Sequence, residues 1–174
     1  MQSPIVFREV KQEDNEGLAR MIRQVFLEHD APQFGTVFSD PTTDDLYGLF
    51  RHPGSVLWVA EAKGIPVGCC GIYPTEGLES DCAELVKYYL ASSERGRGTG
   101  RRMMELCIDS ARKLAYKRLY LESMPHFSKA VGIYEKLGFR NLPGPLGNSG
   151  HTTCNIWMLL DLQMRHSEPG RPAE

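Results

Sequence analysis

The sequence predicts an α+β domain whose sheet contains one parallel crossover. Strand-like segments and segments with helical spacing of apolar residues follow one another along the 174 residues in the order β-α-α-β-β-β-α-β-α-β. In the middle of that order a strand, a loop, a helix and a further strand succeed one another, and a connection of this length joins parallel strands. The two strands before them are joined by a short turn, which is typical of antiparallel pairing.

The first third of the chain is expected to form a strand, a helix, a loop and a short second helix. Residues 4–10 (PIVFREV) are rich in side chains that favour strands. The apolar residues that follow have helical spacing and form one stripe: Leu18, Met21, Ile22, Val25 and Phe26. Residues 30–41 are expected to form a loop, and residues 42–45 (TTDD) an N-cap with acids in the first turn of the second helix.

A β-hairpin is the clearest local signal in the sequence. Two β-rich runs within residues 55–75 flank the dipeptide Lys63-Gly64, which is typical of a short turn. Residues 82–90 (CAELVKYYL) are a further predicted strand, which ends where a glycine-rich loop begins. That loop is therefore expected to join a strand to the helix that follows it.

Two helices and two strands complete the predicted order. The helix after the glycine-rich loop is amphipathic, and its apolar face contains Met103, Met104, Cys107, Ile108, Ala111, Leu114 and Ala115. Residues 117–123 (KRLYLES) and residues 154–162 (CNIWMLLDL) are the predicted strands. Between them another helix is expected to end at Gly138, at the place of a C′ residue, and its apolar face contains Ala130, Ile133, Tyr134 and Leu137.

Length and composition predict one globular domain. Residues 1–164 are assigned to it, because the chain is long enough to bury one substantial core. Residues 165–174 (RHSEPGRPAE) are polar and are expected to be a disordered tail. The formal net charge of −2 lacks the basic excess of a general nucleic-acid binder. No apolar run approaches the ~20 residues that span a bilayer, and no secretory signal pattern is recognised.

The use of cysteine predicts a cytoplasmic protein. The five cysteines form no CxxC pattern, and their number is odd. Cys69 and Cys70 are adjacent within an apolar run, which suits buried thiols in a reducing compartment better than a disulfide framework. The sequence gives no reason to expect zinc or a flavin.

The stretch Ser93–Met104 (SERGRGTGRRMM) contains three glycines in five positions and four arginines. Glycines at this density indicate a backbone that turns sharply or comes close to another group. A strand, a glycine-rich loop and a helix N-terminus can together bind phosphate, because unpaired N–H groups and the helix dipole face the ligand there. A surface turn with solvated arginines explains the same residues equally well when the loop is taken alone.

Two nucleotide-binding motifs do not fit this loop. A Walker A loop needs Lys followed by Ser or Thr after its last glycine, whereas Gly100 is followed by two arginines. The dinucleotide motif GxGxxG does not match Gly96, Gly98 and Gly100, whose spacing is GxGxG. Glu122 stands near the position at which that motif expects an acid, so the second alternative is weakened and not removed.

Two separate motifs resemble the GNAT superfamily of acyl-CoA N-acyltransferases. Arg95-x-x-Gly98-x-Gly100 is similar to the R/Q-x-x-G-x-G/A signature of that family, and residues 130–139 (AVGIYEKLGF) are similar to its A-x-x-x-Y-x-x-x-G-F pattern. The resemblance covers nearly the whole chain in element order and residues 83–140 in motif detail. It implies an α/β/α sandwich-like fold, in which a twisted, mostly antiparallel mixed sheet has a central, splayed pair of parallel strands.

The resemblance also implies acetyl-CoA as cosubstrate, without a metal. In this family the glycine-rich loop wraps the pyrophosphate, and pantetheine lies beside the central strand like an added strand. The residues thereby expected at the cofactor are Tyr88, Tyr89, Leu90, Arg95, Gly96, Arg97, Gly98, Thr99, Gly100, Arg101 and Ser123. The sequence departs from the family in two ways: Thr99 replaces an aliphatic residue, and the asparagine that many relatives carry after the next strand is missing.

Acetyl transfer to an amine requires two proton transfers. An alkylamine is mostly protonated near neutrality and must lose a proton, and the leaving thiolate benefits from a proton donor. The resemblance implies Tyr134 as the acid, although packing on the apolar helix face explains this tyrosine too. Glu84 is the candidate base, and strand alternation predicts that it shares a face with Val86, Tyr88 and Leu90. A solvated strand end explains Glu84 equally well.

The acceptor is the part that the sequence specifies least. A small-molecule amine or an amino-acid derivative is expected, and the alternatives are a protein lysine or N-terminus, or acyl-CoA sensing without catalysis. Phe34 lies in the connection where this fold usually recognises its acceptor, and His151 is a second candidate lining residue. His151 and Cys154 also suggest a Cys–His nucleophile or a metal site, but no third group is evident. The sequence is compatible with a homodimer and demonstrates none.

Overall fold

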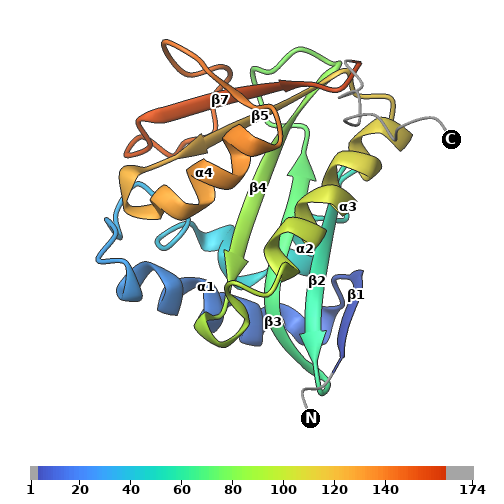
Figure 1. Cartoon of the computed structure of the whole chain (residues 1–174), viewed down its shortest axis with the longest axis vertical. Coiled ribbons are helices and arrows are strands. Elements are labelled where there is room, and N and C mark those ends of the chain that lie inside the picture. The colour runs from blue at the N-terminus through green and yellow to red at the C-terminus, as the bar shows by residue number, and fades with distance from the viewer. Residues whose placement is uncertain (1–3, 164–174) are drawn as a thin grey trace, which may run out of the picture.

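A seven-stranded sheet with helices on both faces forms the frame of the protein (Figure 1). The computed structural model describes residues 4–163. The strands are β1 (Ile5–Glu9), β2 (Val56–Ala62), β3 (Ile65–Tyr73), β4 (Cys82–Leu90), β5 (Arg118–Ser123), β6 (Arg140–Asn141) and β7 (Ile156–Asp161). The helices are α1 (Asn15–Glu28), α2 (Leu46–Leu49), α3 (Thr99–Lys113) and α4 (Ser128–Lys136). The strand order across the sheet is β1-β2-β3-β4-β5-β7-β6, and among the neighbouring strands of residues 4–163 only β4 and β5 are parallel.

The predicted α+β class and the order of the main elements are confirmed, with differences in short elements. β6 was not predicted, because a two-residue strand has no periodicity to detect. A 3-10 turn, Pro41–Asp44, occupies most of the expected TTDD cap. The N-cap of α2 is Asp45 alone, whose carboxylate accepts the N–H of Gly48 at 3.0 Å. The predicted tail, residues 165–174, lies outside the described residues.

Two predicted turns have the backbone that their residues favour. Lys63 and Gly64 adopt φ values of +52° and +77° and close the hairpin between β2 and β3. Gly138 adopts a φ of +97° just after α4 and donates its N–H to the carbonyl of Glu135 at 3.0 Å. The hairpin turn and the end of α4 therefore lie at the residues that the sequence predicts.

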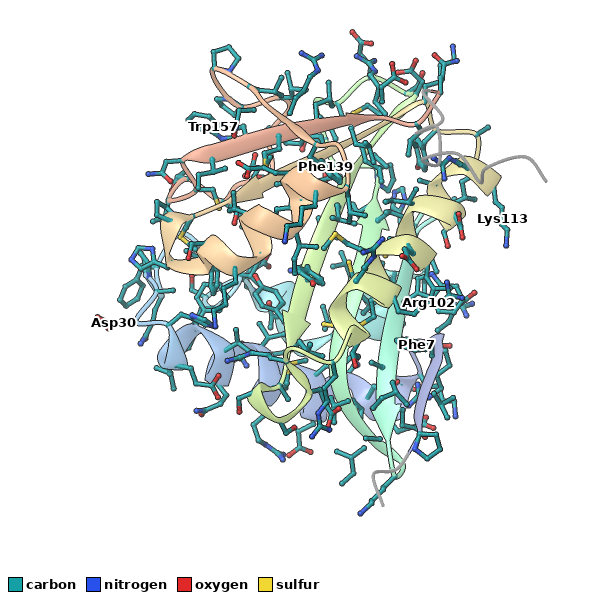
Figure 2. All side chains as sticks on the ribbon, viewed as in Figure 1. Phe7, Asp30, Arg102, Lys113, Phe139 and Trp157 are labelled. Carbon is teal, nitrogen blue, oxygen red and sulfur yellow. The ribbon has the colours of Figure 1, made fainter. Side chains whose placement is uncertain are left out.

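Two apolar layers hold the helices to the sheet. α1 and α2 cover one face, where Leu18 and Phe26 of α1 are almost completely buried. α3 and α4 cover the other face, where Met103 and Cys107 of α3 are completely buried. In Figure 2 side chains fill the space between these layers, whereas Lys113 points outward at the end of α3. Burial of this apolar surface is the main term that stabilises the fold.

The parallel pair at the centre of the sheet separates soon after it forms. Only the first three residues of β4 pair with β5, and the last of them is Glu84, opposite Tyr120. β5 stays paired with β7 along its whole length, so from Leu85 onward the edge of β4 that faces β5 is open. The splayed pair that the family resemblance implies is thereby confirmed. It leaves a V between the strands (Figure 1), with Glu84 at the vertex.

A β-bulge interrupts β4 beyond the vertex. In the pairing with β3, Lys87 and Tyr88 together stand opposite one residue, Cys70. Lys87 adopts a φ of +56° at this point, a left-handed conformation that is uncommon for a residue other than glycine. The bulge adds one residue to the strand, so every side chain after it changes its face.

The bulge corrects one expectation about Glu84. Val86 packs in the layer of α1, whereas Tyr88 and Leu90 pack in the layer of α3. Glu84 stands two residues before Val86 and shares its face. The prediction that Glu84 also shares a face with Tyr88 and Leu90 is wrong, because strict alternation does not hold across the extra residue.

Candidate functional site

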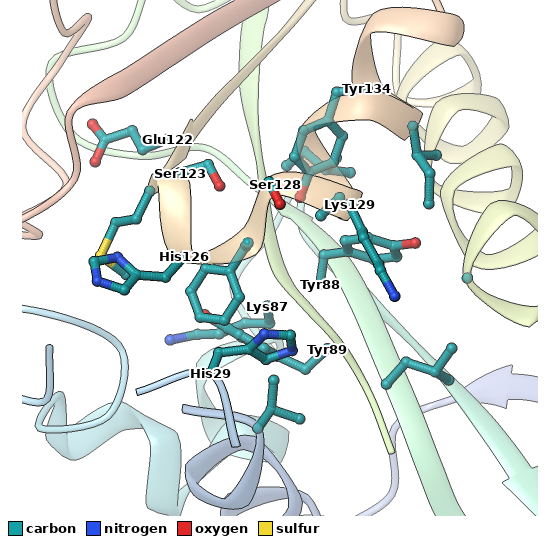
Figure 3. A pocket seen from close by; sticks show the side chains of 18 of the residues that line it. His29, Lys87, Tyr88, Tyr89, Glu122, Ser123, His126, Ser128, Lys129 and Tyr134 are labelled. Atoms are coloured by element: carbon teal, nitrogen blue, oxygen red, sulfur yellow. The ribbon is translucent and has the colours of Figure 1, made fainter. Parts of the chain in front are cut away.

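A cavity of about 620 Å³ opens between the splayed strands. Its walls come from β4 and β5, the end of α1, the loop before α3, and α4 (Figure 3). A space of this size suits a small ligand or part of a larger one. Most of the predicted site residues line it: Glu84, Tyr88, Tyr89, Leu90, Arg95, Gly96, Gly98, Gly100, Arg101, Ser123, Tyr134 and His151.

The loop before α3 carries the backbone that an anion site requires. Gly96 and Gly98 adopt φ values of +74° and +82°, a region that favours glycine. α3 begins at Thr99 without a side-chain cap. The first N–H groups of a helix have no partner within the helix, and the dipole makes that end positive. An anion that enters the cavity at this end meets free donors and a favourable field.

Gly100, the third glycine of the loop, is required for a different reason. A Cβ at Gly100 would collide with the hydroxyl oxygen of Tyr88. A Cβ at Gly96 or Gly98 would meet nothing within 4 Å. The close approach that the glycines indicate is therefore, at Gly100, a contact between α3 and β4 within the protein itself.

Arg95 ties the loop to its neighbours. Its Nε donates to the carbonyl of Leu90 at 3.0 Å, and its Nη2 donates to Glu28 of α1 at 2.6 Å. The side chain of Arg95 is one-third exposed. The guanidinium thus already fixes the loop to the ends of β4 and α1, and any contact with a phosphate uses its remaining N–H groups.

Two further arginines of the loop are held only at the surface. Nη1 of Arg97 lies 3.3 Å from Oε2 of Glu94, and Nε of Arg101 lies 3.1 Å from Oε1 of Glu105. Ion pairs between exposed side chains contribute about 0–1 kcal/mol, so either arginine can turn to another anion at little cost. Arg101 lines the cavity and Arg97 does not.

Thr99 and Phe34 are the other two predicted residues that the structure leaves outside the cavity lining. Thr99 is buried as the first residue of α3, so its backbone remains in the first turn of that helix. Phe34 stands on the loop between α1 and α2 with 86% of its surface exposed. Its carbonyl accepts a hydrogen bond from the Thr153 hydroxyl at 3.0 Å, which joins that loop to the segment before β7.

Tyr134 brings a phenol to the cavity from α4. Its ring packs between Tyr88 and Phe139, with centroids 5.8 Å from each. Within residues 4–163 its hydroxyl makes no hydrogen bond, while every fully buried polar side-chain atom there has a partner. The hydroxyl therefore faces the cavity (Figure 3). Burial raises the pKa of Tyr134 well above its usual range, so the phenol keeps its proton at neutral pH.

Glu84 is a buried carboxyl at the vertex of the V. It is only 4% exposed, and it accepts a hydrogen bond from the hydroxyl of Thr75. The pKa of Glu84 is raised to about 7, mainly by burial and also by nearby Glu122, while the hydrogen bond from Thr75 and the charge of Lys87 partly oppose the rise. A carboxyl whose pKa lies near the operating pH is suited to accept a proton during a reaction.

Glu122 and Lys87 line the cavity and were not among the predicted site residues. Glu122 of β5 accepts hydrogen bonds from the hydroxyls of Tyr120 at 2.8 Å and Ser149 at 2.7 Å. Lys87 is almost completely buried where β4 bulges. A lysine in the middle of the apolar run CAELVKYYL is a signal that could have located it. The bulge that turns Lys87 toward the α1 side has no sequence pattern of its own.

His151 lines the cavity from the segment before β7. Its Nε2 lies 3.2 Å from Oδ2 of Asp40, on the loop between α1 and α2. The same two segments are joined a second time by the contact between Thr153 and Phe34. The two contacts hold the segments together beside the part of the cavity that lies away from α3.

Cys154 does not have the properties of a nucleophile. It lines the cavity near Glu84 and Glu122, and burial together with these two acids raises the pKa of its thiol to about 12. The thiolate is the reactive form of cysteine, so this thiol stays protonated and inert at neutral pH.

Among residues 4–163 no cluster of three or more His, Cys, Asp or Glu residues could hold a metal. No helix in the same part of the chain is long and apolar enough to cross a membrane.

Comparison with known sequences agrees with this geometry. Residues 23–139 match the model of the acetyltransferase (GNAT) family. The uncharacterized N-acetyltransferase YjgM of Escherichia coli is 38% identical over 162 residues, which cover 92% of this chain and 96% of YjgM. The match therefore extends over nearly the full length of both proteins.

Solved structures share the fold. A GNAT-family acetyltransferase from Staphylococcus aureus superposes with a TM-score of 0.78 at 20% identity, covering 92% of this chain and all of that one. The yncA protein of Salmonella typhimurium, solved with its cofactor acetyl-CoA, has a TM-score of 0.72 at 16% identity and covers 94% of this chain and 96% of its own. The chain belongs to the GNAT family and is an acetyl-CoA-dependent N-acetyltransferase.

Proposed function

We propose that the enzyme transfers the acetyl group of acetyl-CoA directly to the primary amine of a small molecule or an amino-acid derivative while both are bound. One observation carries this proposal. A single continuous cavity is lined by the loop before α3, by Tyr134 and by Glu84. A site for the donor's phosphates, a proton donor and a proton acceptor therefore surround the same space.

The cofactor end of the cavity is the end that the loop before α3 forms. We expect the free N–H groups of this loop to hold the pyrophosphate. Lys129, Lys136 and Arg101 are exposed residues at the same cavity and add positive charge. The open edge of β4 beyond Leu85 offers main-chain groups to the amides of pantetheine, as an edge strand does to an added strand.

The proposed reaction moves two protons. The amine nitrogen attacks the thioester carbonyl carbon, an N–C bond forms and the C–S bond breaks. Glu84 accepts the proton that the amine loses, directly or through a water molecule, and Tyr134 gives its proton to the sulfur of coenzyme A. The products are the N-acetylated amine and the free thiol, and exchange with solvent restores both side chains.

The contacts at the acceptor end favour a small acceptor. His151 with Asp40, and Thr153 with Phe34, hold two segments together beside the cavity, as a closed pocket requires. Acetylation of a protein lysine or N-terminus is the alternative that needs an open groove. In the other alternative, acyl-CoA sensing, Tyr134 and the buried carboxyl of Glu84 have no chemical role.

We also propose a cytoplasmic location. All five cysteines are free, and four of them are buried, which suits a reducing compartment. The homodimer with which the sequence is compatible stays a prediction.

The pH dependence of kcat is expected to report Glu84. Because the pKa of Glu84 is raised to about 7, kcat should rise roughly tenfold per pH unit below pH ~6 and level off above pH ~8. The measurement is the initial rate at saturating acetyl-CoA and acceptor between pH 5 and 9.

The variant Glu84→Gln is the control for this profile. It keeps the shape of the side chain and cannot accept the proton, so kcat should fall at least about tenfold and the inflection near pH 7 should disappear. An inflection that persists in this variant would assign the ionisation to another group of the cavity.

Calorimetric titration and an acceptor screen test the function itself. Acetyl-CoA and coenzyme A should bind with micromolar Kd values, and ATP, which lacks pantetheine, should bind weakly. Release of coenzyme A thiol is then followed with a panel of small amines, amino acids and lysine peptides. Turnover of peptides alone would favour a protein amine over a small molecule as the acceptor. Binding of acetyl-CoA without turnover of any amine would favour a role in acyl-CoA sensing.

A further inference from the structure

Lys87 is a buried cation that faces the cavity. Its side chain is 4% exposed, and the only carboxylate within 4 Å of Nζ in residues 4–163 is that of Asp40, whose Oδ2 lies 3.9 Å away. That distance is too long for a hydrogen bond. Every fully buried polar side-chain atom in the same residues has a hydrogen-bond partner, so Nζ, which has none, must touch the cavity that Lys87 lines.

Asp40 has other partners and does not satisfy Lys87. Its Oδ1 accepts from the backbone N–H of Thr42 at 2.9 Å and from the hydroxyl of the same residue at 2.7 Å. Its Oδ2 faces Nε2 of His151 at 3.2 Å. An ammonium group has three donors, and those of Lys87 remain available to a molecule in the cavity.

The backbone of Lys87 also points to function. Lys87 occupies the left-handed region, with a φ of +56°, at the bulge of β4. Strained conformations of residues other than glycine gather at ligand sites, where the surroundings enforce them. A buried charge and a strained backbone coincide here in one residue, and each is unfavourable for folding alone.

Charged and polar side chains lie with Lys87 on one side of the cavity. Lys87 extends from β4 toward one side, together with Glu122 and Ser123 of β5, while Tyr88 and Tyr134 lie on the other side (Figure 3). Ser123 is buried, and its hydroxyl makes no hydrogen bond in the described part of the chain. An acceptor that enters between β4 and β5 thus meets the carboxyl at the vertex, a free ammonium and a free hydroxyl.

We propose that Lys87 binds an anionic group of the acceptor, so that the enzyme acetylates amino-acid-like molecules that carry a carboxylate close to the amine. This inference rests on the proposed function and narrows its substrate class. The amine lies toward Glu84, and the carboxylate is held by the Lys87 ammonium with help from the hydroxyl of Ser123. A cation and an acid at neighbouring positions complement a zwitterion better than they complement a simple amine.

Matched acceptors test the inference in the wild-type enzyme. Each L-amino acid is compared with its carboxamide, which keeps the amine and the side chain and removes the negative charge. We expect kcat/KM to be at least about tenfold higher for the acids. An amide neighbour lowers the pKa of an amine, so chemical reactivity favours the carboxamides, and a preference for the acids is due to binding. A preference for carboxamides or for simple alkylamines overturns the inference.

The variant Lys87→Met links that preference to this residue. Methionine keeps an unbranched chain of similar length, and assays at pH 8.5 keep Glu84 ionised in both proteins. We expect KM for the acids to rise at least about tenfold, with kcat/KM for the carboxamides and Kd for acetyl-CoA within about twofold of wild type. An equal loss for acids and carboxamides would show that Lys87 supports the fold or the base, and would overturn the inference.

A second lysine provides a matched control. Lys63 also adopts a positive φ, +52°, but on the exposed turn between β2 and β3. Lys63→Met should leave both classes of acceptor unchanged. If Lys87→Met does not fold, the comparison of acids with carboxamides in the wild-type enzyme still tests whether the enzyme prefers acceptors that carry a carboxylate. If no amine of any charge is acetylated, the proposed function fails and this inference fails with it.

Discussion

A Gly98→Asp variant is expected to lose most of its affinity for coenzyme A and acetyl-CoA. Gly98 adopts a φ of +82° directly before α3, where the free N–H groups converge. A carboxylate at this position places a negative charge against the proposed pyrophosphate site and costs about 2–4 kcal/mol of binding free energy, or roughly a 30- to 1000-fold higher Kd. Calorimetric titration with coenzyme A measures the change directly.

Gly98→Asn separates charge from shape in this experiment. Asparagine is nearly isosteric with aspartate, carries no charge and tolerates a left-handed backbone. A Cβ at Gly98 would meet nothing within 4 Å, so both variants should fold, and thermal unfolding checks this. The asparagine variant should lose much less affinity than the aspartate variant. Wild-type affinity in Gly98→Asp would exclude this loop as the phosphate site.

Tyr134→Phe is expected to lower kcat at least about tenfold and by as much as ~10⁴-fold, the range for general acid catalysis. Phenylalanine keeps the ring between Tyr88 and Phe139. The lost hydroxyl makes no hydrogen bond within residues 4–163, so the stability of the variant and its Kd for acetyl-CoA should be close to those of wild type. Steady-state rates and a cofactor titration measure the two quantities separately.

Tyr116→Phe is the matched control for removing a phenol oxygen. The hydroxyl of Tyr116 donates to the carbonyl of Gly54 at 2.8 Å, and Tyr116 does not line the cavity. This variant should lose about 1 kcal/mol of stability and keep its kcat. Wild-type turnover in Tyr134→Phe would leave Tyr134 as a packing residue and would require another source for the proton.

Most of the fold could be predicted because the signals are local. The strand predicted at residues 82–90 has the same bounds in the structure, since a run of β-forming side chains bounded by turns is sufficient to define it. The turn at Lys63-Gly64 follows from the two residues alone. The parallel direction of β4 and β5 was expected from the strand-helix-strand order and is confirmed. That order alone does not determine direction, because helices also lie between β1 and β2 and between β5 and β7, and both of those pairs are antiparallel.

The part of the site that could be predicted best is the part that a motif describes. Gly98 and Tyr134 belong to two recognisable patterns, and both line the cavity. The second partner of Arg95 is Glu28, 67 residues earlier in the chain, and no local pattern connects them. The inward position of Lys87 depends on a bulge set by the pairing of β4 with β3. Tertiary contacts of this kind determine where a charged side chain points, and they carry no periodicity.

The burial of Glu84 has a consequence for the stability of the whole protein. The pKa of Glu84 is about 7 in the folded chain, against 4.5 for an ordinary glutamate, so the native state binds this proton more tightly than the unfolded chain does. The stabilisation from the bound proton is complete below pH ~4.5 and is lost as the pH rises through 7, a change of about 3 kcal/mol. That is a large share of the free energy of unfolding of a typical domain, which is about 5–15 kcal/mol. The alkaline conditions that prepare this carboxyl for catalysis are therefore those in which it stabilises the fold least.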